Sequence, residues 1–454
     1  MKKRILSLTL IIQLGFSCLW AQWSTLYMPN PRVQFSATST GGVVYFGPGN
    51  NNGLPTPAMM AYTPRSNKWQ RITLPGSSRT FSTMLAASDG KIYIAGGQST
   101  TFSPIRYEST VNIYQPDQQK FAQANLSEAR VVGAALEVGD RLLFAGGKRS
   151  NAPELYSSRV DVFNLKTQIW SRKELSLARV GIAAGTNGTV AIFAGGELNN
   201  NAVTNVIDVY LATSDTWTTL QLSEAKSYAS CVVFDNKAYI IGGCFPNGMA
   251  SDKVEILDLA NLSFIPNNLR ISRARCGSAA HKVGDKIVVA AGGLLDFQGN
   301  VWYDSFKEVD ILDPKNQTLR RDQLQFDRIN HAAAVLDDQL YIAGGLSMGI
   351  PLETIREVEV YRPTLTRSRS ITDLPKLKVH PNPVSNGSVV IETDLQFFDD
   401  NLLLRLLDLN GQVILEQMMN APKVQVELPD LPKGTYVFNL IGSKGTRNVS
   451  FMIF

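Results

Sequence analysis

Short apolar runs separated by polar loops recur along most of this 454-residue chain, with a period of about fifty residues. Six of these runs end in a Gly-Gly pair, and a Gly-Pro-Gly stands at the corresponding place ahead of them. The markers are Gly47-Pro48-Gly49, Gly96-Gly97, Gly146-Gly147, Gly195-Gly196, Gly242-Gly243, Gly292-Gly293 and Gly344-Gly345. A fixed period of this length is typical of a repeat architecture, in which one unit cannot bury its apolar face without its neighbours.

Each repeat carries four strand signals, as the unit that starts at Trp170 shows. An outer strand begins there, and a run of small apolar residues follows at 180–184. An Asn-Gly turn then leads to two further apolar runs, at 190–194 and 206–210. Asn-Gly between apolar runs is a strong hairpin signal. Four short antiparallel strands per repeat predict one propeller blade.

Seven glycine markers predict seven blades. The last repeat stops near Tyr361 without a fourth strand, whereas residues 23–26 at the start of the chain have the pattern of one. We therefore expect the N-terminal strand to complete the last blade and close the ring, which leaves no sheet edge exposed. Six blades with an irregular first unit are the alternative.

Residues 23–361 resemble the kelch repeat, which combines an apolar run, a Gly-Gly pair, a tyrosine and a tryptophan about six residues later. The resemblance implies an all-β fold, a seven-bladed kelch β-propeller with one repeat per blade. Glycine fits a strand end that is crowded against the next blade, and the tryptophans fill space between blades.

The first residues have the pattern of a secretory signal peptide. Three basic residues precede an apolar stretch at 5–16, and small residues lead to Ala21. We expect cleavage after Ala21, with a lipid anchor at Cys18 as the alternative. No other segment approaches 18 consecutive apolar residues, so we expect no membrane-spanning segment.

The composition divides the chain into four parts. Residues 1–21 are the expected signal peptide and residues 22–363 the propeller. Residues 364–374 are polar and unpatterned, as in a linker. Beyond it the fifty-residue period is lost, and residues 375–454 have the short strand signals of a small β-sandwich domain.

The C-terminal part carries three short motifs. They are His-Pro-Asn-Pro from His380, Asp-Leu-Asn-Gly-Gln-Val from Asp408 and Leu-Pro-Lys-Gly-Thr-Tyr from Leu431. Together they resemble the type A C-terminal sorting domain of the type IX secretion system of Bacteroidetes-like bacteria. The resemblance implies passage through the periplasm, the type IX machinery as a partner, and a secreted or outer cell-surface location. A small immunoglobulin-like appendage without a sorting role is the alternative.

The net charge and the cysteines bear on two further properties, nucleic-acid binding and disulfide formation. The formal net charge is +5, of which three positive charges lie in the signal peptide. This small excess does not predict nucleic-acid binding. Outside the signal peptide the cysteines are Cys231, Cys244 and Cys276. Cys244 and Cys276 fall at similar heights in adjacent repeats, so a disulfide between them is conceivable.

A basic residue stands 15 to 17 residues ahead of each glycine marker, directly before the expected innermost strand. Recurrence at one position predicts a basic ring at the channel mouth, able to bind an acidic sugar or acidic peptide. The alternative is that these side chains bond loop carbonyls or an acidic neighbour and build the repeat. The ring consists of Arg32, Arg79, Arg130, Arg179, Lys226, Arg275 and Arg328.

The loops after the glycine pairs lie on the same expected face and differ among blades, as recognition loops do. Aromatic side chains there can stack on sugar rings or anchor a protein partner. The candidate ligand contacts are Tyr156, Phe245, Trp302 and Tyr303.

Catalytic signals are few. The histidines are His281, His331 and His380, and we expect the first two to be packed or hydrogen-bonded rather than metal ligands. Galactose oxidase, also a kelch propeller, needs two His, two Tyr and a Cys for copper, and no such set can be assigned here. We therefore predict no catalytic residue, metal or cofactor. Kelch-type sialic acid mutarotases work with channel-facing Glu and Arg, for which the candidate carboxylates are Glu154, Glu197 and Glu353.

The sequence thus predicts a monomeric secreted or cell-surface binding protein that recognises a glycan or protein ligand through the loop face, without catalysis. The alternative is a carbohydrate-active enzyme, mutarotase- or lyase-like, that acts on an acidic sugar in a basic central channel. A structural part of a surface assembly is a third interpretation.

Overall fold

The computed structural model describes residues 22–453 except 52–53, 100–104, 150–154, 297–300, 350–352, 364–376, 383–386, 394–401, 409–411 and 443–444. The expected signal peptide (1–21), the expected linker (364–374) and Glu154 lie outside the described residues. The chain divides into two compact units, Met1–Thr364 and Leu365–Phe454.

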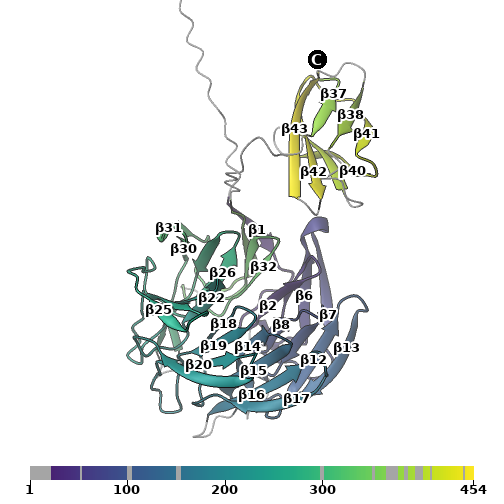
Figure 1. Ribbon diagram of the computed structural model, residues 1–454. Coiled ribbons are helices and arrows are strands. Elements are labelled where there is room, and N and C mark those ends of the chain that lie inside the picture. The colour runs from purple at the N-terminus through teal and green to yellow at the C-terminus, as the bar shows by residue number, and fades with distance from the viewer. Residues whose placement is uncertain are drawn as a thin grey trace, which may run out of the picture. The chain divides into compact units, whose positions relative to one another are not determined.

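The first unit consists of four-stranded antiparallel sheets that follow one another along the chain (Figure 1). Seven such sheets lie within its described residues. From innermost to outermost strand, the first four are β2 (Ala37–Thr40), β3 (Val43–Phe46), β6 (Ala58–Thr63), β7 (Lys68–Thr73); β8 (Thr83–Ala86), β9 (Ile92–Ala95), β12 (Thr110–Gln115), β13 (Lys120–Asn125); β14 (Val131–Val138), β15 (Arg141–Lys148), β16 (Tyr156–Asn164), β17 (Trp170–Glu174); and β18 (Ala183–Thr186), β19 (Val190–Ala194), β20 (Val206–Leu211), β21 (Thr216–Gln221). The last three are β22 (Ser230–Phe234), β23 (Lys237–Ile241), β24 (Val254–Asp258), β25 (Ser263–Ile265); β26 (Ala279–Val283), β27 (Lys286–Ala290), β30 (Glu308–Asp313), β31 (Thr318–Gln323); and β32 (Ala332–Leu336), β33 (Gln339–Ala343), β36 (Glu357–Tyr361), β1 (Trp23–Tyr27).

The loops of these sheets contain short hairpins and a 3₁₀ turn. The turn is η1 (Pro64–Ser66), and the hairpins are β4 (Asn50–Asn51) with β5 (Leu54–Pro55), β10 (Gln98–Ser99) with β11 (Arg106–Tyr107), β28 (Gly293–Asp296) with β29 (Val301–Ser305), and β34 (Leu346–Ser347) with β35 (Glu353–Thr354).

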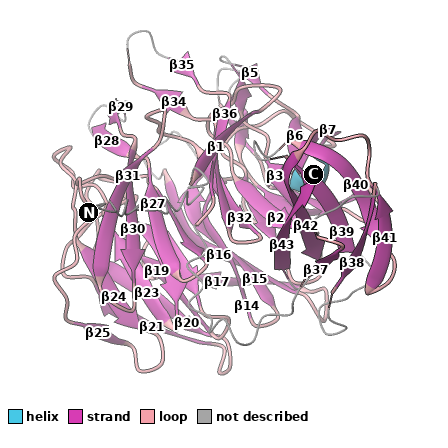
Figure 2. Ribbon diagram, turned by 90° about the horizontal axis from the view of Figure 1, so that it is seen from above, coloured by secondary structure: helices cyan, strands magenta, loops and turns pink. Residues whose placement is uncertain are grey.

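The sheets close into a ring. Each innermost strand contacts those of the two neighbouring sheets, in the cycle β2, β8, β14, β18, β22, β26, β32 and back to β2. Strand β1 pairs with β36, from Trp23 opposite Tyr361 to Tyr27 opposite Glu357, so the start of the chain completes the last sheet. Figure 2 shows the sheets from above, with β1 beside β36. The expected all-β propeller fold is confirmed.

The core lies between neighbouring sheets. The second strand of a sheet has an apolar, buried centre because it is covered on both faces, as in β9, whose four residues are all buried. In four sheets the third strand ends in an aromatic ring that packs on a tryptophan of the fourth, such as Tyr210 and Trp217 with ring centroids 4.9 Å apart. These rings fill the wedge that opens toward the outside of the propeller.

The glycine pairs join each sheet to the next. Gly96 has a φ of +61°, and a Cβ atom on it would lie 2.2 Å from the carbonyl oxygen of Arg130 in the following sheet. Gly97 has a φ of +114°, and its N–H donates to that same oxygen at 3.0 Å. Only glycine tolerates both the left-handed backbone and the close approach. The equivalent bond from Gly345 to the Arg32 carbonyl, also 3.0 Å, joins the last sheet to the first.

The second unit is a small β-sandwich, as expected. One sheet has β37 (Lys378–His380), β38 (Ser388–Glu392) and β41 (Lys423–Glu427), and the other has β40 (Val413–Met419), β39 (Leu402–Leu407), β42 (Gly434–Gly442) and β43 (Gly445–Ile453). Both sheets contribute to one apolar core, with Val389 and Ile391 from the first and Leu404, Phe438 and Phe451 from the second.

Candidate functional site

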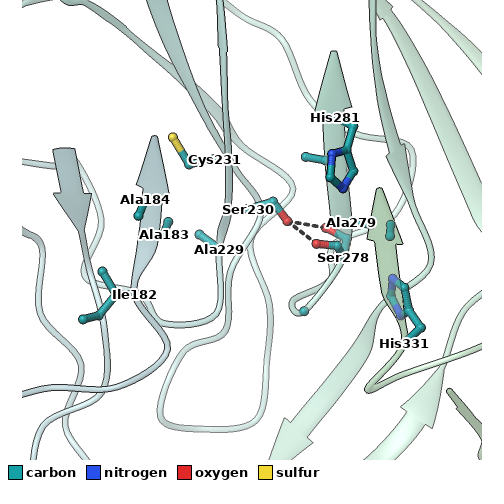
Figure 3. A pocket seen from close by; sticks show the side chains of 13 residues that line it. Ile182, Ala183, Ala184, Ala229, Ser230, Cys231, Ser278, Ala279, His281 and His331 are labelled. Atoms are coloured by element: carbon teal, nitrogen blue, oxygen red, sulfur yellow. Dashed lines mark hydrogen bonds between the residues drawn. The ribbon is translucent and has the colours of Figure 1, made fainter. Parts of the chain in front are cut away.

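Residues in and next to the innermost strands line a cavity of about 290 Å³ in the central channel. Figure 3 shows that its walls come from β18, β22, β26 and the start of β32. Small side chains dominate the lining, since alanine, glycine and serine recur on these strands. The lining residues are Ile182, Ala183, Ala184, Ala229, Ser230, Cys231, Gly277, Ser278, Ala279, Ala280, His281, His331 and Ala333.

Two serines provide hydroxyl groups in this cavity. The Oγ atom of Ser230 donates to the carbonyl oxygen of Ser278 and lies 2.9 Å from the Ser278 Oγ (Figure 3). The bond links neighbouring innermost strands and holds both hydroxyl groups at one height in the channel.

Two histidines line the same cavity. His281 lies in β26 and His331 directly precedes β32. Burial lowers the pKa of His281 to about 4. Burial, helped by the Arg328 guanidinium and by His281, lowers the pKa of His331 to about 3. Both rings are therefore neutral near pH 7, and the His331 Nδ1 atom is buried without a hydrogen-bond partner among the described residues.

The thiol of Cys231 also lines the cavity. Burial raises its pKa to about 12, so it stays protonated and is a poor nucleophile. Cys244 and Cys276 form a disulfide that joins the loops of two neighbouring sheets. The disulfide that the sequence left open is therefore present, and Cys231 is the free cysteine of the described residues.

The channel mouth is built by residues that the sequence analysis did not single out. They stand two positions after a basic residue, and several have a positive φ. Backbone hydrogen bonds join these residues between neighbouring sheets. The Phe81 N–H donates to Gln34 O at 2.8 Å, and the Gly277 N–H donates to Tyr228 O at 2.8 Å. The sequence contains a signal for these residues, because they lie at a fixed offset from the basic residues. The offset can be interpreted only once the starts of the innermost strands are known.

An aromatic cluster covers part of this mouth. A Cβ atom on Gly277 would lie 2.6 Å from the Trp302 ring, so the glycine makes room for the indole. The Trp302 ring meets Tyr228 edge-on, with centroids 6.3 Å apart. Trp302 also packs on the cluster that contains the Cys244–Cys276 disulfide. Two expected loop contacts, Trp302 and Tyr303, thus belong to one hairpin, β28–β29.

The seven basic residues do not form a ligand-binding ring. Their side chains are between 0% and 3% exposed, and none lines the cavity. Arg130 shows the reason, since its guanidinium donates to the carbonyl oxygens of Phe144 and Gly146 at 2.9 and 3.0 Å. It also pairs with Asp161 at 2.8 Å. The expected ring at the channel mouth is corrected to a set of buried struts, one per sheet: Arg32, Arg79, Arg130, Arg179, Lys226, Arg275 and Arg328.

The same pairing recurs in four other sheets. Each basic side chain meets an acidic side chain from the third strand of its own sheet, and that carboxylate also accepts a backbone N–H from the loop before the innermost strand, as Asp208 does from Ser176 at 3.2 Å. The pairs are Arg179–Asp208, Lys226–Glu255, Arg275–Asp310 and Arg328–Glu359. None of the described residues that line the central cavity is consequently a lysine or an arginine.

A second cavity, of about 400 Å³, lies on the loop face between two neighbouring sheets. We call it the loop-face cleft, and it is lined by Glu128, Arg149, Tyr156, Ser157, Ser158, Arg159, Glu174, Ala178 and Asn199. Arg149 pairs with Glu128 at 2.9 Å, and Arg159 with Glu174 at 2.8 Å. The Tyr156 N–H donates to the Asn199 Oδ1 at 2.8 Å. Of the expected loop contacts, Tyr156 is the one that lines this cleft.

The remaining candidates are dispersed. Glu197 is buried, and its carboxylate accepts a hydrogen bond of 2.6 Å from the Tyr156 hydroxyl. Burial raises the pKa of Glu197. The backbone of Glu353 lies in β35. Phe245 is half-buried, and Tyr303 is 51% exposed with its hydroxyl donating to Gly248 O.

Within the part of the chain that the structure describes, no group of three or more His, Cys, Asp or Glu side chains is placed to hold a metal ion. None of the described helices has the length and hydropathy needed to cross a membrane.

Two family models match the chain. Residues 132–345 match the KLHDC2/KLHL20/DRC7 Kelch-repeats domain, and residues 378–453 match the Secretion system C-terminal sorting domain. No curated protein matches the sequence.

Solved structures share the fold at low identity. The structure of YjhT is 15% identical with a TM-score of 0.50, and the match covers 65% of this chain and 99% of that one. A fungal alcohol oxidase of the AA5 family, solved in complex with copper, is 14% identical with a TM-score of 0.61, and the match covers 95% of this chain and 99% of that one. Such identities show the fold alone. Residues 132–345 therefore belong to a kelch-repeat domain and residues 378–453 to a type IX C-terminal sorting domain, which indicates secretion or a cell-surface location for this protein.

Proposed function

We propose that this protein is a secreted or cell-surface binding protein that recognises a glycan through its loop-face cleft. The observation that carries the proposal is the cleft itself, a cavity of about 400 Å³ whose lining residues are all of a polar type except Ala178. Ligand pockets typically measure about 300–1,000 Å³. The cleft is thus large enough for one or two sugar units.

The polar groups of the cleft are held in place before a ligand arrives. The ion pairs Arg149–Glu128 and Arg159–Glu174 restrain four long side chains. The bond from the Tyr156 N–H fixes the Asn199 amide and leaves its Nδ2 group as a donor. Fixed donors and acceptors suit the hydroxyl groups of a sugar, because little side-chain entropy is lost on binding.

A protein ligand is the second candidate, and a different observation favours it. Tyr303 and Met249 are 51% and 60% exposed, and the Tyr303 hydroxyl contacts the neighbouring Gly248. Exposed large side chains on adjacent loops can anchor a partner.

Two observations weigh against the enzyme alternative. The basic side chains are buried away from the channel, so they offer no grip for an acidic sugar there. Glu197, the candidate carboxylate with a raised pKa, is 5% exposed and engaged by Tyr156. The structure thus supports recognition better than turnover.

The test uses the secreted full chain in a glycan-array screen followed by titration calorimetry. Asn199→Asp keeps the acceptor for the Tyr156 N–H but removes the Nδ2 donor and adds a negative charge. We expect it to weaken glycan binding at least tenfold, which corresponds to about 1.4 kcal/mol. Arg172→Ala, on the exposed outer strand β17 and outside the cleft, is the control and should bind normally.

Glycan binding that Asn199→Asp leaves unchanged would place the ligand elsewhere and refute the cleft as its site. No glycan binding at all, together with capture of a protein that Tyr303→Ala abolishes, would favour the second candidate.

A further inference from the structure

We propose that the central cavity is a second binding site, for a neutral polyhydroxylated molecule of the size of a monosaccharide. The site would be formed by His281, His331, Ser230 and Ser278. It goes beyond the proposed function, because these residues belong to the innermost strands and none of them lines the loop-face cleft.

Side chains do not fill the channel at this place, because the cavity walls consist of small residues. Alanine stands at 184, 229, 279 and 333, where larger side chains would fill the channel. The volume of about 290 Å³ lies at the lower end of the range for small-molecule pockets. It therefore suits one sugar ring.

An unpaired polar atom points to the kind of ligand. The His331 Nδ1 is buried and has no hydrogen-bond partner among the described residues. Leaving such an atom unpaired costs about 1–3 kcal/mol. A hydroxyl group can both donate and accept, so it suits an imidazole ring in either tautomer.

The cavity lining does not favour an acidic ligand, because it offers no counter-charge. None of the lining residues is Lys, Arg, Asp or Glu. The nearby Arg328 is paired with Glu359 and bonds the carbonyl oxygen of Gly344 at 2.9 Å, so its charge is already compensated. A carboxylate in this cavity would lose its water without gaining a counter-charge.

The neutral state of both imidazoles supports the same class of ligand. Burial keeps the pKa of His281 and His331 well below 7, and each neutral ring offers one donor and one acceptor. An apolar ligand would leave these nitrogens and the hydroxyl groups of Ser230 and Ser278 without new partners.

The chain offers a direct test on the unmodified protein, because it contains three histidines. His380 lies in the sorting unit and serves as an internal control. The full chain is labelled with ¹⁵N-histidine and titrated with glucose, galactose, mannose and N-acetylglucosamine, and separately with glucuronate and N-acetylneuraminate. We expect at least one neutral sugar to shift the ring signals of His281 and His331, with no shift at His380 and none from the acidic sugars.

Variants then separate the two sites. His331→Ala should weaken neutral-sugar binding at least tenfold, whereas His331→Gln, whose amide keeps a donor and an acceptor, should lose less. Asn199→Asp should leave binding in the channel unchanged even if it abolishes binding in the cleft. Absence of any ring shift with every neutral sugar, or a stronger response to glucuronate, would overturn the proposal.

Discussion

At the scale of single residues, one backbone hydrogen bond accounts for which sheets carry the buried ion pair and which do not. The carboxylate of Asp161 pairs with the basic side chain of its sheet and also accepts the N–H of Ser127 at 2.9 Å. In the second sheet the residue at the Ser127 position is Pro75, which has no N–H to donate. The acid is replaced there by Asn112, whose Nδ2 donates to the Pro75 carbonyl oxygen at 3.2 Å.

The first sheet follows the same rule. Pro29 stands at the serine position and Met60 at the acid position, so Arg32 has no acidic partner among the residues that the structure describes. Burial lowers the pKa of both Arg32 and Arg79 to about 10, and backbone carbonyl oxygens replace the missing carboxylates. In both sheets that lack the acid, a proline thus stands where the other sheets have a residue whose N–H the carboxylate accepts.

The channel histidines predict a pH dependence of stability. The pKa values of His281 and His331 in the folded protein, about 4 and about 3, lie below the ordinary 6.5. Between these values the unfolded chain binds more protons, so their contribution is complete above pH 6.5 and is lost as the pH falls. We expect each ring to cost about 1.4 kcal/mol per pH unit in that window.

The measurement is the free energy of unfolding in denaturant at pH 7.5 and pH 5.0. A His281→Gln/His331→Gln variant should lose less stability between the two pH values than the unmodified protein. Equal losses would show that the rings are already charged, or are not buried, in the folded state.

At the scale of elements, Arg130 connects two strands of its own sheet and also bonds to the preceding sheet. The side chain of Arg130 bonds carbonyl oxygens at the end of β15 and pairs with Asp161 in β16. Its carbonyl oxygen accepts the N–H of Gly97 from the preceding sheet. Arg130 therefore stabilises its own sheet and also the contact between that sheet and the preceding one.

Removing the acid should expose this role. We expect Asp161→Ala to lower the free energy of unfolding by about 3–5 kcal/mol, because a buried guanidinium is left without its partner. Asp161→Asn should cost less, since an amide occupies the equivalent place in the second sheet. Denaturant unfolding measures both values.

Asp140→Ala is the matched control for that series. Its carboxylate pairs with Lys166 at the surface, where such a pair contributes at most about 1 kcal/mol. A loss no larger for Asp161→Ala than for Asp140→Ala would contradict the role of Arg130 as a strut.

At the scale of the whole molecule, the ring depends on a strand from the start of the chain. Trp23 packs on Tyr361 with ring centroids 5.1 Å apart, and its Nε1 donates to Asp322 at 3.0 Å in the preceding sheet. Without β1, the edge of β36 would be exposed and the contact with β31 lost. An unpaired edge strand also invites association with other chains.

We therefore expect a variant that lacks residues 22–27 to lose the single cooperative unfolding transition of the propeller and to aggregate. Circular dichroism during heating, with light scattering, measures both effects against the chain that retains β1. A variant that remains monomeric and unfolds at an unchanged temperature would show that the closing strand is dispensable.

The sequence by itself determined the features that depend on local pattern. The glycine markers reveal the repeat because only glycine fits where one sheet meets the next, as at Gly96. The strand pattern of residues 23–26 predicts the closing strand, and the motifs from His380 onward identify the sorting domain. These signals are short-range, and each has a backbone or burial requirement that few residue types meet.

Only the tertiary structure decided where side chains point. The sequence places Arg130 before an innermost strand, but its direction depends on Asp161, 31 residues later, and on carbonyl oxygens of another strand. The same holds for His331, which lines the cavity together with residues of three other innermost strands. A periodic pattern specifies which strands form, whereas a binding site depends on partners that several strands bring together from distant parts of the chain.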